Sequence, residues 1–271
     1  MIIVTGCNGF IGSNLVSQLN KLGFNNIIGV DDLSRKKNLI NIEHCEIEGL
    51  LDIEEFESNY LLKDKSFNDV NQIFHQGACT NTMEWDAEYM MKNNFSFSQQ
   101  LLDFAERNSV SFIYASSASV YGGGKKFEEI RENENPINLY AFSKYLFDQL
   151  VRQKVKANKI QIVGLRYFNV YGPNESHKGQ MASVAYHLHQ QLKEGNDVKL
   201  FEGSGGFGPG EQRRDFIYVD DVVKVNLWFM NNPDVSGIFN VGTGKSQTFN
   251  EVAKAVIEWH GKGSITYIPF P

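Results

Sequence analysis

The chain has 271 residues, 42% of them hydrophobic, which is enough to bury a large core in one α/β enzyme of ordinary composition. Its 26 basic residues against 32 acidic ones give a net charge of −6, so the chain lacks the overall positive field typical of a nucleic-acid binder. No stretch approaches the roughly 18 apolar residues of a membrane-spanning helix, and the apolar start at residues 1–4 is too short for a signal sequence.

A glycine turn follows the first predicted strand. Residues 2–5 form an apolar run that leads into Gly6, Gly9 and Gly12 and then into a helical pattern. Gly6 gives the turn its backbone freedom, Gly9 lets a pyrophosphate approach, and Gly12 lets the helix pack tightly on the strand. The start of the helix would face the phosphate charge. We expect a dinucleotide here, and an ordinary strand-to-helix turn is the alternative interpretation.

The second predicted strand, residues 26–31, ends in two acidic residues. Asp31 and Asp32 lie about 20 residues after the glycines, where an acid bonds the adenosine ribose hydroxyls and favours NAD. Just beyond, residues 35–37 are Arg-Lys-Lys, which could meet the 2′-phosphate of NADP. A solvated basic loop explains these residues equally well, so the pattern leaves the choice of cofactor open.

Further strands are predicted at residues 72–75, 110–116 and 159–167, separated mostly by helical patterns. This alternation predicts an α/β fold: a doubly wound parallel sheet with helices on both faces. The strand at 110–116 runs into Ser116 and Ser117, which places hydroxyl groups at the carboxyl edge of the sheet. Ligands bind at that edge in such folds.

Tyr140 and Lys144 stand one helical turn apart, so a phenol and an ammonium lie side by side on one helix. A nearby lysine cation lowers the pKa of a tyrosine, which makes the phenolate available as a base at neutral pH. Ser117 could bond the same substrate oxygen, although spacing alone does not exclude Ser116 or Ser119. On most surface helices such a pair is only two solvated side chains.

The glycine turn, Ser117 at a strand end and the Tyr140/Lys144 spacing resemble the extended short-chain dehydrogenase/reductase family of sugar-nucleotide enzymes, over nearly the whole chain. Within that family, residues 77–86, 89–94 and 176–185 resemble the members that invert C6″ of an ADP-heptose, a precursor of the lipopolysaccharide inner core. The resemblance implies a Rossmann sheet with a smaller, mixed C-terminal substrate domain. It also implies a redox-neutral epimerisation through tightly held NADP, with NAD as the alternative.

The resemblance assigns roles residue by residue. Ser117, Tyr140, Lys144 and Lys178 would be catalytic, with Tyr140 serving one orientation of the intermediate and Lys178 the other. The cofactor would contact Gly6, Gly9, Phe10, Ile11, Gly12, Asp31, Asp32, Lys37, Asn38, Gln76, Gly77, Ala78, Cys79, Thr80, Asn93, Lys144, Val170 and Lys178. The substrate would contact Asn169, Gln180, His187, Phe201, Glu202, Gly203, Ser204 and Arg214, whose planar fork suits a diphosphate.

Three features depart from the family pattern. Asn38 stands where members commonly have a lysine for the 2′-phosphate, so Lys36 or Lys37 would have to substitute. The glycine-rich stretch 203–212 is longer than usual, and its glycines predict mobility over the substrate, either as a lid or as a loop that alters specificity. The chain stops just after a predicted strand at 265–271, where members continue, so we expect a truncated substrate domain.

The same pattern predicts two domains. Residues 1–168 would form the dinucleotide-binding domain, with a returning segment near 235–244, and residues 169–271 the substrate domain. The glycines of the returning segment could mark a second phosphate loop, but an ordinary strand-ending loop is favoured.

Cys7, Cys45 and Cys79 are widely spaced and form neither a CxxC pair nor a Cys/His cluster, so we expect no disulfide framework and no metal site. These features indicate a reducing compartment, and we expect a cytoplasmic protein with neither nucleic acid nor membrane as a partner. The resemblance also implies a homo-oligomer.

Two other functions remain open at this stage. A sugar-nucleotide 4-epimerase or 4,6-dehydratase would share Ser117, Tyr140 and Lys144 but not the stretch 177–181. A non-catalytic dinucleotide sensor is the more distant alternative, because such proteins often lose the Tyr/Lys pair that this chain retains.

Overall fold

The computed structural model describes residues 1–34, 36–62, 69–157 and 159–270, and the chain divides into two compact units. The first unit comprises Met1–Tyr167 and Asp220–Val241, and the second comprises Phe168–Val219 and Gly242–Pro271. The chain therefore returns to the first unit at Asp220, at the start of the helix that precedes the predicted returning strand.

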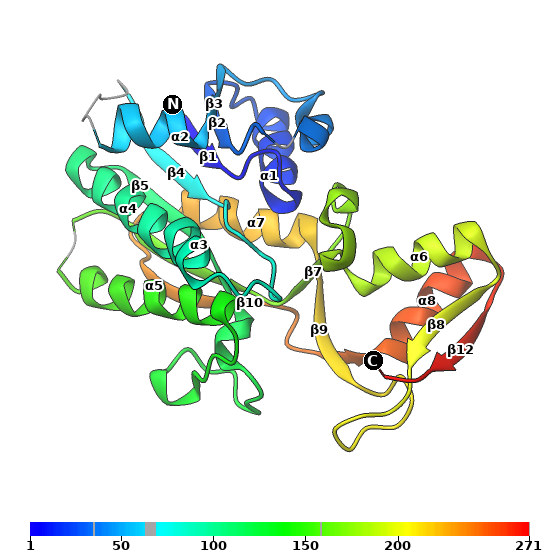
Figure 1. Cartoon of the computed structure of the whole chain (residues 1–271). Coiled ribbons are helices and arrows are strands. Elements are labelled where there is room, and N and C mark those ends of the chain that lie inside the picture. The colour runs from blue at the N-terminus through cyan, green and yellow to red at the C-terminus, as the bar shows by residue number, and fades with distance from the viewer. Residues whose placement is uncertain (35, 63–68, 158, 271) are drawn as a thin grey trace. The chain divides into compact units, whose positions relative to one another are not determined.

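A seven-stranded parallel sheet forms the centre of the first unit (Figure 1). Its strands are β1 (Ile2–Thr5), β2 (Ile27–Asp31), β3 (Gly49–Asp52), β4 (Gln72–His75), β5 (Ser111–Ser117), β6 (Ile162–Tyr167) and β10 (Gly237–Val241). The order is β10-β6-β5-β4-β1-β2-β3, so the direction of strand addition reverses between β1 and β4. Ligands bind beyond the carboxyl ends of the strands at such a reversal. The predicted doubly wound fold is confirmed, although β3 was not predicted.

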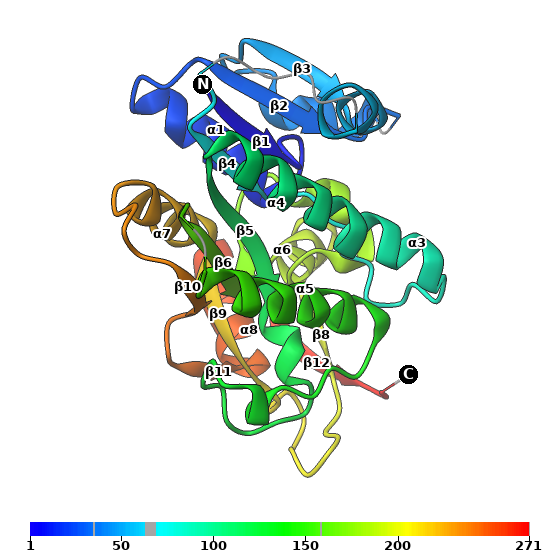
Figure 2. The same ribbon diagram turned by 90° about the vertical axis from the view of Figure 1, so that its left-hand side faces the viewer.

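Helices cover both faces of this sheet. They are α1 (Phe10–Lys21), α2 (Ile53–Phe56), α3 (Ala87–Met91), α4 (Phe97–Asn108), α5 (Leu139–Val155) and α7 (Val219–Met230). Figure 1 shows α2 to α5 on one face and α1 and α7 on the other, and Figure 2 looks onto the α4 and α5 face. A π-helical turn, Lys92–Ser96, joins α3 to α4, and a second one, Glu57–Leu61, follows α2. Short 3₁₀ turns span Lys36–Ile42, Ala118–Tyr121 and Arg131–Asn133.

The core of the first unit lies between the sheet and the helices α4 and α5. Phe147 of α5 is 1% exposed and packs against strand β5, with its ring centroid 4.8 Å from that of Tyr114 and 6.4 Å from that of Phe112. Burial of such apolar surface is the main force that fixes α5 on the sheet. The position of α5 matters because it carries Tyr140 and Lys144.

The second unit is a smaller mixed domain. Its strands are β7 (Asn169–Tyr171), β8 (Asp197–Phe201), β9 (Arg213–Tyr218), β11 (Ser246–Thr248) and β12 (Ser264–Ile268), and its helices are α6 (Val184–Glu194) and α8 (Phe249–His260), with a 3₁₀ turn at Ser176–Met181. Strand β9 pairs in parallel with β7 and antiparallel with β11, while β8 and β12 form a separate parallel pair. Leu188 and Leu192 of α6 pack with Ala253 of α8 in the core of this unit. Within the described residues, none of the helices of the chain combines the length and apolar character needed to cross a membrane.

We expect Phe147→Ala to lower the free energy of unfolding by about 3–5 kcal/mol, because it leaves a cavity between α5 and the sheet. Phe24→Ala is the matched control: Phe24 is 41% exposed, and its loss should change stability by no more than about 0.5 kcal/mol. Urea unfolding followed by far-ultraviolet circular dichroism measures both. Equal midpoints for the two variants would contradict this account of how α5 is held.

Candidate active site

The structure brings Ser117, Tyr140 and Lys144 together in the first unit. Helix α5 begins at Leu139 because the side chain of Asn138 caps it, accepting a hydrogen bond of 2.8 Å from the Ala141 amide. Tyr140 therefore lies in the first turn and Lys144 in the second. Ser117 is the last residue of β5, and its hydroxyl group hydrogen-bonds the Tyr140 phenol.

The neighbouring serines point elsewhere. The Ser116 hydroxyl donates to the Asp148 carboxylate at 3.0 Å, and the Ser119 hydroxyl donates to the Ser117 oxygen at 2.9 Å. Of the three serines that spacing left open, Ser117 is thus the one that bonds the phenol.

Lys144 of helix α5 is a buried cation that contacts the same strand, β5. It is 3% exposed, and its ammonium donates a hydrogen bond of 2.8 Å to the Ala115 carbonyl oxygen. Burial lowers the pKa of Lys144 to about 8, although the negative charge of Asp148 raises it. The ammonium form therefore predominates at neutral pH and is lost as the pH rises through about 8.

The pKa of Tyr140 departs from the expectation based on its spacing from Lys144. Burial raises the pKa of the phenol, while the hydrogen bond with Ser117 lowers it and the charge of Cys79 raises it. The expected lowering by Lys144 is not seen within the described residues. The reason is geometric, because the Lys144 ammonium is directed to the Ala115 carbonyl.

The glycine turn has the close packing that a dinucleotide fold requires. Gly6 has φ +68°, and a Cβ there would lie 2.5 Å from the Gly77 nitrogen. A Cβ on Gly12 would lie 2.0 Å from the Gly6 carbonyl oxygen. Gly9 is the N-cap of α1 and has no side chain with which to cap that helix. Phe10 and Ile11 form its first turn. This arrangement fits a pyrophosphate held by backbone N–H groups.

The acidic pair after β2 shapes this turn. Asp31 accepts a hydrogen bond of 2.7 Å from the Asn8 amide and one of 2.8 Å from the Asp32 amide, and Asp32 accepts one from the Ser34 amide at 3.1 Å. Both carboxylates thus lie at the carboxyl end of β2, beside the glycine turn. The side chains of Lys37 and Asn38 lie outside the described part of the chain.

The segment 76–80 leaves β4 next to the glycine turn. The Gly77 amide donates to the Thr5 hydroxyl at 3.3 Å, and the amide and carbonyl of Cys79 both bond the Asn94 side chain, at 2.8 and 2.9 Å. The Gln76 side chain bonds Tyr167 and Asn226, and Asn93 donates to the Tyr89 carbonyl oxygen. Ala78 is half-buried and Thr80 exposed. The segment thus runs past the strand-order reversal, where a dinucleotide would lie.

A cavity of about 260 Å³ in the second unit gathers three more predicted residues. It is lined by Phe168, Asn169, Val170, Lys178, Met181, Ala182, Ser183, Val184, Phe216 and Phe249. The Arg214 guanidinium lies 5.9 Å from the centre of the Phe249 ring. Gln180, His187 and the segment Phe201, Glu202, Gly203 and Ser204 do not line this cavity as described.

Lys178 sits on a kinked turn in this unit. The kink is at Gly179, which has φ +53°, and Glu175 holds the turn by accepting hydrogen bonds from the Gly172 and Ser183 amides at 3.0 and 2.5 Å. Burial lowers the pKa of Lys178, and the charge of Glu175 opposes this. The lowered pKa makes the neutral amine of Lys178 easier to form, as an acid/base role requires.

Several residues of these sites were not singled out from the sequence. His75 ends β4 and is buried, with Nδ1 2.6 Å from the Thr5 hydroxyl and Nε2 2.7 Å from the Ser98 hydroxyl, and burial lowers its pKa to about 3. Asp148 lies four residues after Lys144, a spacing that could have indicated it. Asn94 and Glu175 carried no comparable signal, because their contacts are with backbone groups far away in the sequence or across a turn.

Comparison with known proteins gives a consistent result. The model of the NAD dependent epimerase/dehydratase family matches residues 2–242. A curated relative from Alkalilimnicola ehrlichii, named ADP-L-glycero-D-manno-heptose-6-epimerase, is 51% identical over 271 residues, which cover 100% of this chain and 84% of the relative.

Solved structures are similar over almost the whole chain. The crystal structure of Helicobacter pylori ADP-L-glycero-D-manno-heptose-6-epimerase matches with a TM-score of 0.85 and 34% identity, covering 99% of this chain and 84% of the other. The Thermus thermophilus UDP-glucose 4-epimerase, solved as a complex with NAD, matches with a TM-score of 0.78 and 26% identity, covering 99% of this chain and 86% of the other.

We expect Gly12→Ala to weaken dinucleotide binding by about tenfold or more, because the new methyl group would push α1 away from the Gly6 carbonyl. Gly123→Ala is the matched control, since a Cβ at Gly123 meets no atom within 4 Å. The dinucleotide retained after purification and the dissociation constant from calorimetry measure the effect. Wild-type affinity in Gly12→Ala would contradict the role given to this turn.

Proposed function

Since this chain belongs to the NAD dependent epimerase/dehydratase family, we propose that it converts ADP-D-glycero-D-manno-heptose to ADP-L-glycero-D-manno-heptose by inverting C6″. The observation that carries this proposal is the 51% identity, over the full chain, to a relative named for this reaction. The chain is an epimerase, and hence an isomerase. Its proposed product serves synthesis of the lipopolysaccharide inner core.

The proposed chemistry needs one redox group and at least one base. A nicotinamide dinucleotide held by the glycine turn and residues 76–80 would supply the redox chemistry, which is hydride exchange at C6″. Tyr140 exchanges the proton of the C6″ hydroxyl group in one of the two orientations of the reacting sugar. Ser117 bonds the same oxygen and steadies the phenol, and Lys144 keeps a positive charge beside the reacting groups.

Inversion requires that protons be exchanged in two orientations of the intermediate, and Lys178 is the proposed second acid/base group. Support comes from its lowered pKa and from its place in the cavity with Asn169 and Val170. We assign Asn169, Gln180, His187, the segment 201–204 and Arg214 to the ADP-heptose. Arg214 suits the diphosphate because its guanidinium offers two parallel donors. Val170 and Lys178 are assigned to contacts with the dinucleotide as well.

The cofactor is a nicotinamide dinucleotide, and we propose NADP as its form. The basic residues at 35–37 and the family resemblance support NADP, while Asp31 and Asp32 are of the type that favours NAD. Gly6, Gly9, Phe10, Ile11 and Gly12 would hold the pyrophosphate, and residues 76–80 with Asn93 would lie along the dinucleotide. Heating the purified protein to release its bound dinucleotide, followed by mass spectrometry of the released molecule, identifies the form as NAD or NADP.

The resemblance also implies a cytoplasmic homo-oligomer, which we include in the proposal. Light scattering coupled to size-exclusion chromatography measures the number of subunits.

The direct test incubates the purified chain with ADP-D-glycero-D-manno-heptose, without added cofactor, and follows the C6″ configuration by proton NMR. Inversion is the expected result and would also show that a dinucleotide is carried through purification and regenerated. If inversion stays absent after NADP and NAD are added, while a UDP-sugar is epimerised at C4, the substrate assignment is wrong.

We expect Tyr140→Phe to reduce turnover by about 100-fold to 10,000-fold, because it removes the proton acceptor and keeps the ring. Bound dinucleotide should remain at the wild-type level. Tyr145→Phe on the same helix is the control and should turn over normally, because the Tyr145 ring faces Phe142 and Arg131. Normal turnover in Tyr140→Phe would remove that residue from the mechanism.

We expect Lys178→Met to reduce epimerisation by about 100-fold or more, because only one orientation of the intermediate would still exchange its proton with an enzyme group. Lys199→Met, at an exposed position of strand β8, is the control. The informative measurement is a single-turnover experiment with each of the two epimers. A variant that oxidises both epimers at wild-type rates would refute a role for Lys178.

A further inference from the structure

Asp148 is a buried carboxylate that the proposed mechanism leaves unused. It lies on α5, one helical turn beyond Lys144, and is 0% exposed. Tyr114 donates a hydrogen bond of 2.8 Å to one oxygen. Ser116 donates one of 3.0 Å to the other oxygen, which also accepts one of 2.9 Å from the Arg166 guanidinium. These donors compensate the buried charge of Asp148. Removing one member of the buried pair with Arg166 would lower the stability of the fold.

Along strand β5, the residue that contacts Asp148 lies between the two residues that contact Lys144 and Tyr140. Three consecutive residues of strand β5 reach three positions of α5: the Ala115 carbonyl accepts from Lys144, the Ser116 hydroxyl donates to Asp148, and the Ser117 hydroxyl bonds Tyr140. Asp148 is therefore part of the same seam between strand and helix. Any displacement of its turn would also displace the turn that carries Lys144.

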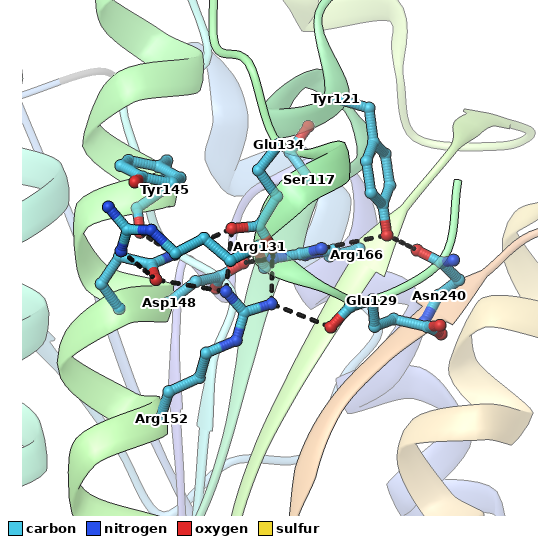
Figure 3. Close-up of polar contacts among 12 residues, drawn as sticks. Ser117, Tyr121, Glu129, Arg131, Glu134, Tyr145, Asp148, Arg152, Arg166 and Asn240 are labelled. Atoms are coloured by element: carbon cyan, nitrogen blue, oxygen red, sulfur yellow. Dashed lines mark hydrogen bonds and ion pairs between the residues drawn. The ribbon is translucent and has the colours of Figure 1, made fainter. Parts of the chain in front are cut away.

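A buried network surrounds Asp148 on its far side (Figure 3). Arg166 of β6 is 0% exposed and also bonds the Tyr121 hydroxyl at 3.0 Å and the Glu134 carboxylate, which in turn pairs with Arg152 of α5 at 2.5 Å. Two guanidinium groups thus balance two carboxylates. Arg166 also pairs with Glu134, so it would keep one carboxylate partner if Asp148 lost its charge.

The charges that face Lys144 come from several elements. His75 of β4 is neutral at physiological pH because burial lowers its pKa to about 3, and Cys79 follows the same strand. On α5 itself, Asp148 is the carboxylate whose charge raises the pKa of Lys144, against the larger effect of burial. Arg166, Arg152 and Glu134 lie around Asp148 as described above.

We propose that Asp148 is a positioning residue of the active site: held by Arg166, its carboxylate fixes the helical turn of Lys144 and places a buried negative charge one turn from this lysine, along the same strand. The inference rests on the proposed function, because it gives Asp148 its importance through Lys144. It adds to that function a buried group that touches neither substrate nor cofactor.

The test measures the ionisation of Lys144 without using substrate. The full chain, with the dinucleotide it retains, is labelled with ¹³C at the lysine ε-carbons, and Lys144 is assigned by the signal missing in Lys144→Arg. We expect a titration midpoint near 8 in the wild type. In Asp148→Asn it should fall by about one pH unit or more, since an opposite charge close by is removed. Asp103→Asn, on helix α4 at a half-exposed ion pair, is the matched control and should leave the midpoint unchanged.

Turnover as a function of pH gives the second readout. Loss of activity on raising the pH should begin about one unit lower in Asp148→Asn than in the wild type, because the ammonium is lost earlier. A variant whose midpoint and pH profile both match the wild type would overturn the proposal, and so would a uniformly lower activity with an unmoved midpoint. Failure of the wild type to epimerise the ADP-heptose would instead refute the proposed function, since the Lys144 titration needs no substrate.

Asp148→Asn could fail to fold, because it removes a charged partner of Arg166. The double variant Asp148→Asn/Arg166→Gln then takes its place, since it removes both charges and keeps hydrogen-bonding groups at both positions. Its Lys144 midpoint should also fall, because Asp148 acts on Lys144 more directly than Arg166 does. An unchanged midpoint in the double variant would overturn the proposal.

Discussion

The attachment of helix α5 to the end of strand β5 is the interaction on which the chemistry depends. Hydrophobic packing by Phe147 sets the distance between helix and sheet. Packing is not directional, however, and would tolerate a helix rotated or shifted by part of a turn. The hydrogen bonds from residues 115–117 remove that freedom, because each fits one position of the helix. Precise placement of the phenol and the ammonium is therefore a property of the polar seam, and the apolar core supplies the force that closes it.

The same division appears at the glycine turn. Its apolar strands and the buried face of α1 would form in many α/β proteins, but the close approach of Gly12 to the Gly6 carbonyl admits no side chain. Backbone atoms of the turn and of α1 therefore pack directly against each other, where side chains would separate them in other proteins. Because the carboxylate of Asp31 is bonded to the Asn8 amide, the acid that follows β2 also fixes this turn. Shaping of the turn, which the structure shows, and recognition of the ribose, which we propose, are then two uses of one residue.

Much of the fold could be predicted from the sequence, because hydrophobic periodicity and glycine spacing are local signals. The strands at 2–5 and 72–75 were placed correctly, and the doubly wound sheet followed from their alternation with helices. Strand β3 was missed because Gly49–Asp52 is short and half-buried, so its apolar pattern is weak. Helix α7 returns the chain to the first unit before the strand that the sequence marks, and no local pattern specifies which unit a helix joins.

The candidate site shows a similar limit. The spacing of Tyr140 and Lys144 predicts that they lie side by side, but it does not predict where the Lys144 side chain points. Because the Lys144 ammonium bonds the Ala115 carbonyl, the expected lowering of the Tyr140 pKa is not seen among the described residues. Ser116, Ser117 and Ser119 were equivalent in the sequence, and only the pleat of β5 and the turn after it distinguish them. Arg166 lies in the strand predicted at 159–167, yet its burial among Asp148, Glu134 and Tyr121 depends on elements more than 15 residues away in the sequence.

The connection between the two units runs directly from the buried network of Arg166. Arg166 and Tyr167 end β6 in the first unit, and after Phe168 the strand β7 begins at Asn169 in the second unit. A few residues therefore join the buried network around Asp148 to the cavity that contains Asn169, Val170 and Lys178. An enzyme that inverts a centre must offer proton-exchanging groups to two orientations of one intermediate. Tyr140 and Lys178 are the groups proposed for these two orientations, and along the chain the segment 167–169 leads from the first unit into the second. The charged network fixes one end of that segment, so the cost of burying Arg166 and Asp148 is linked to function as well as to stability.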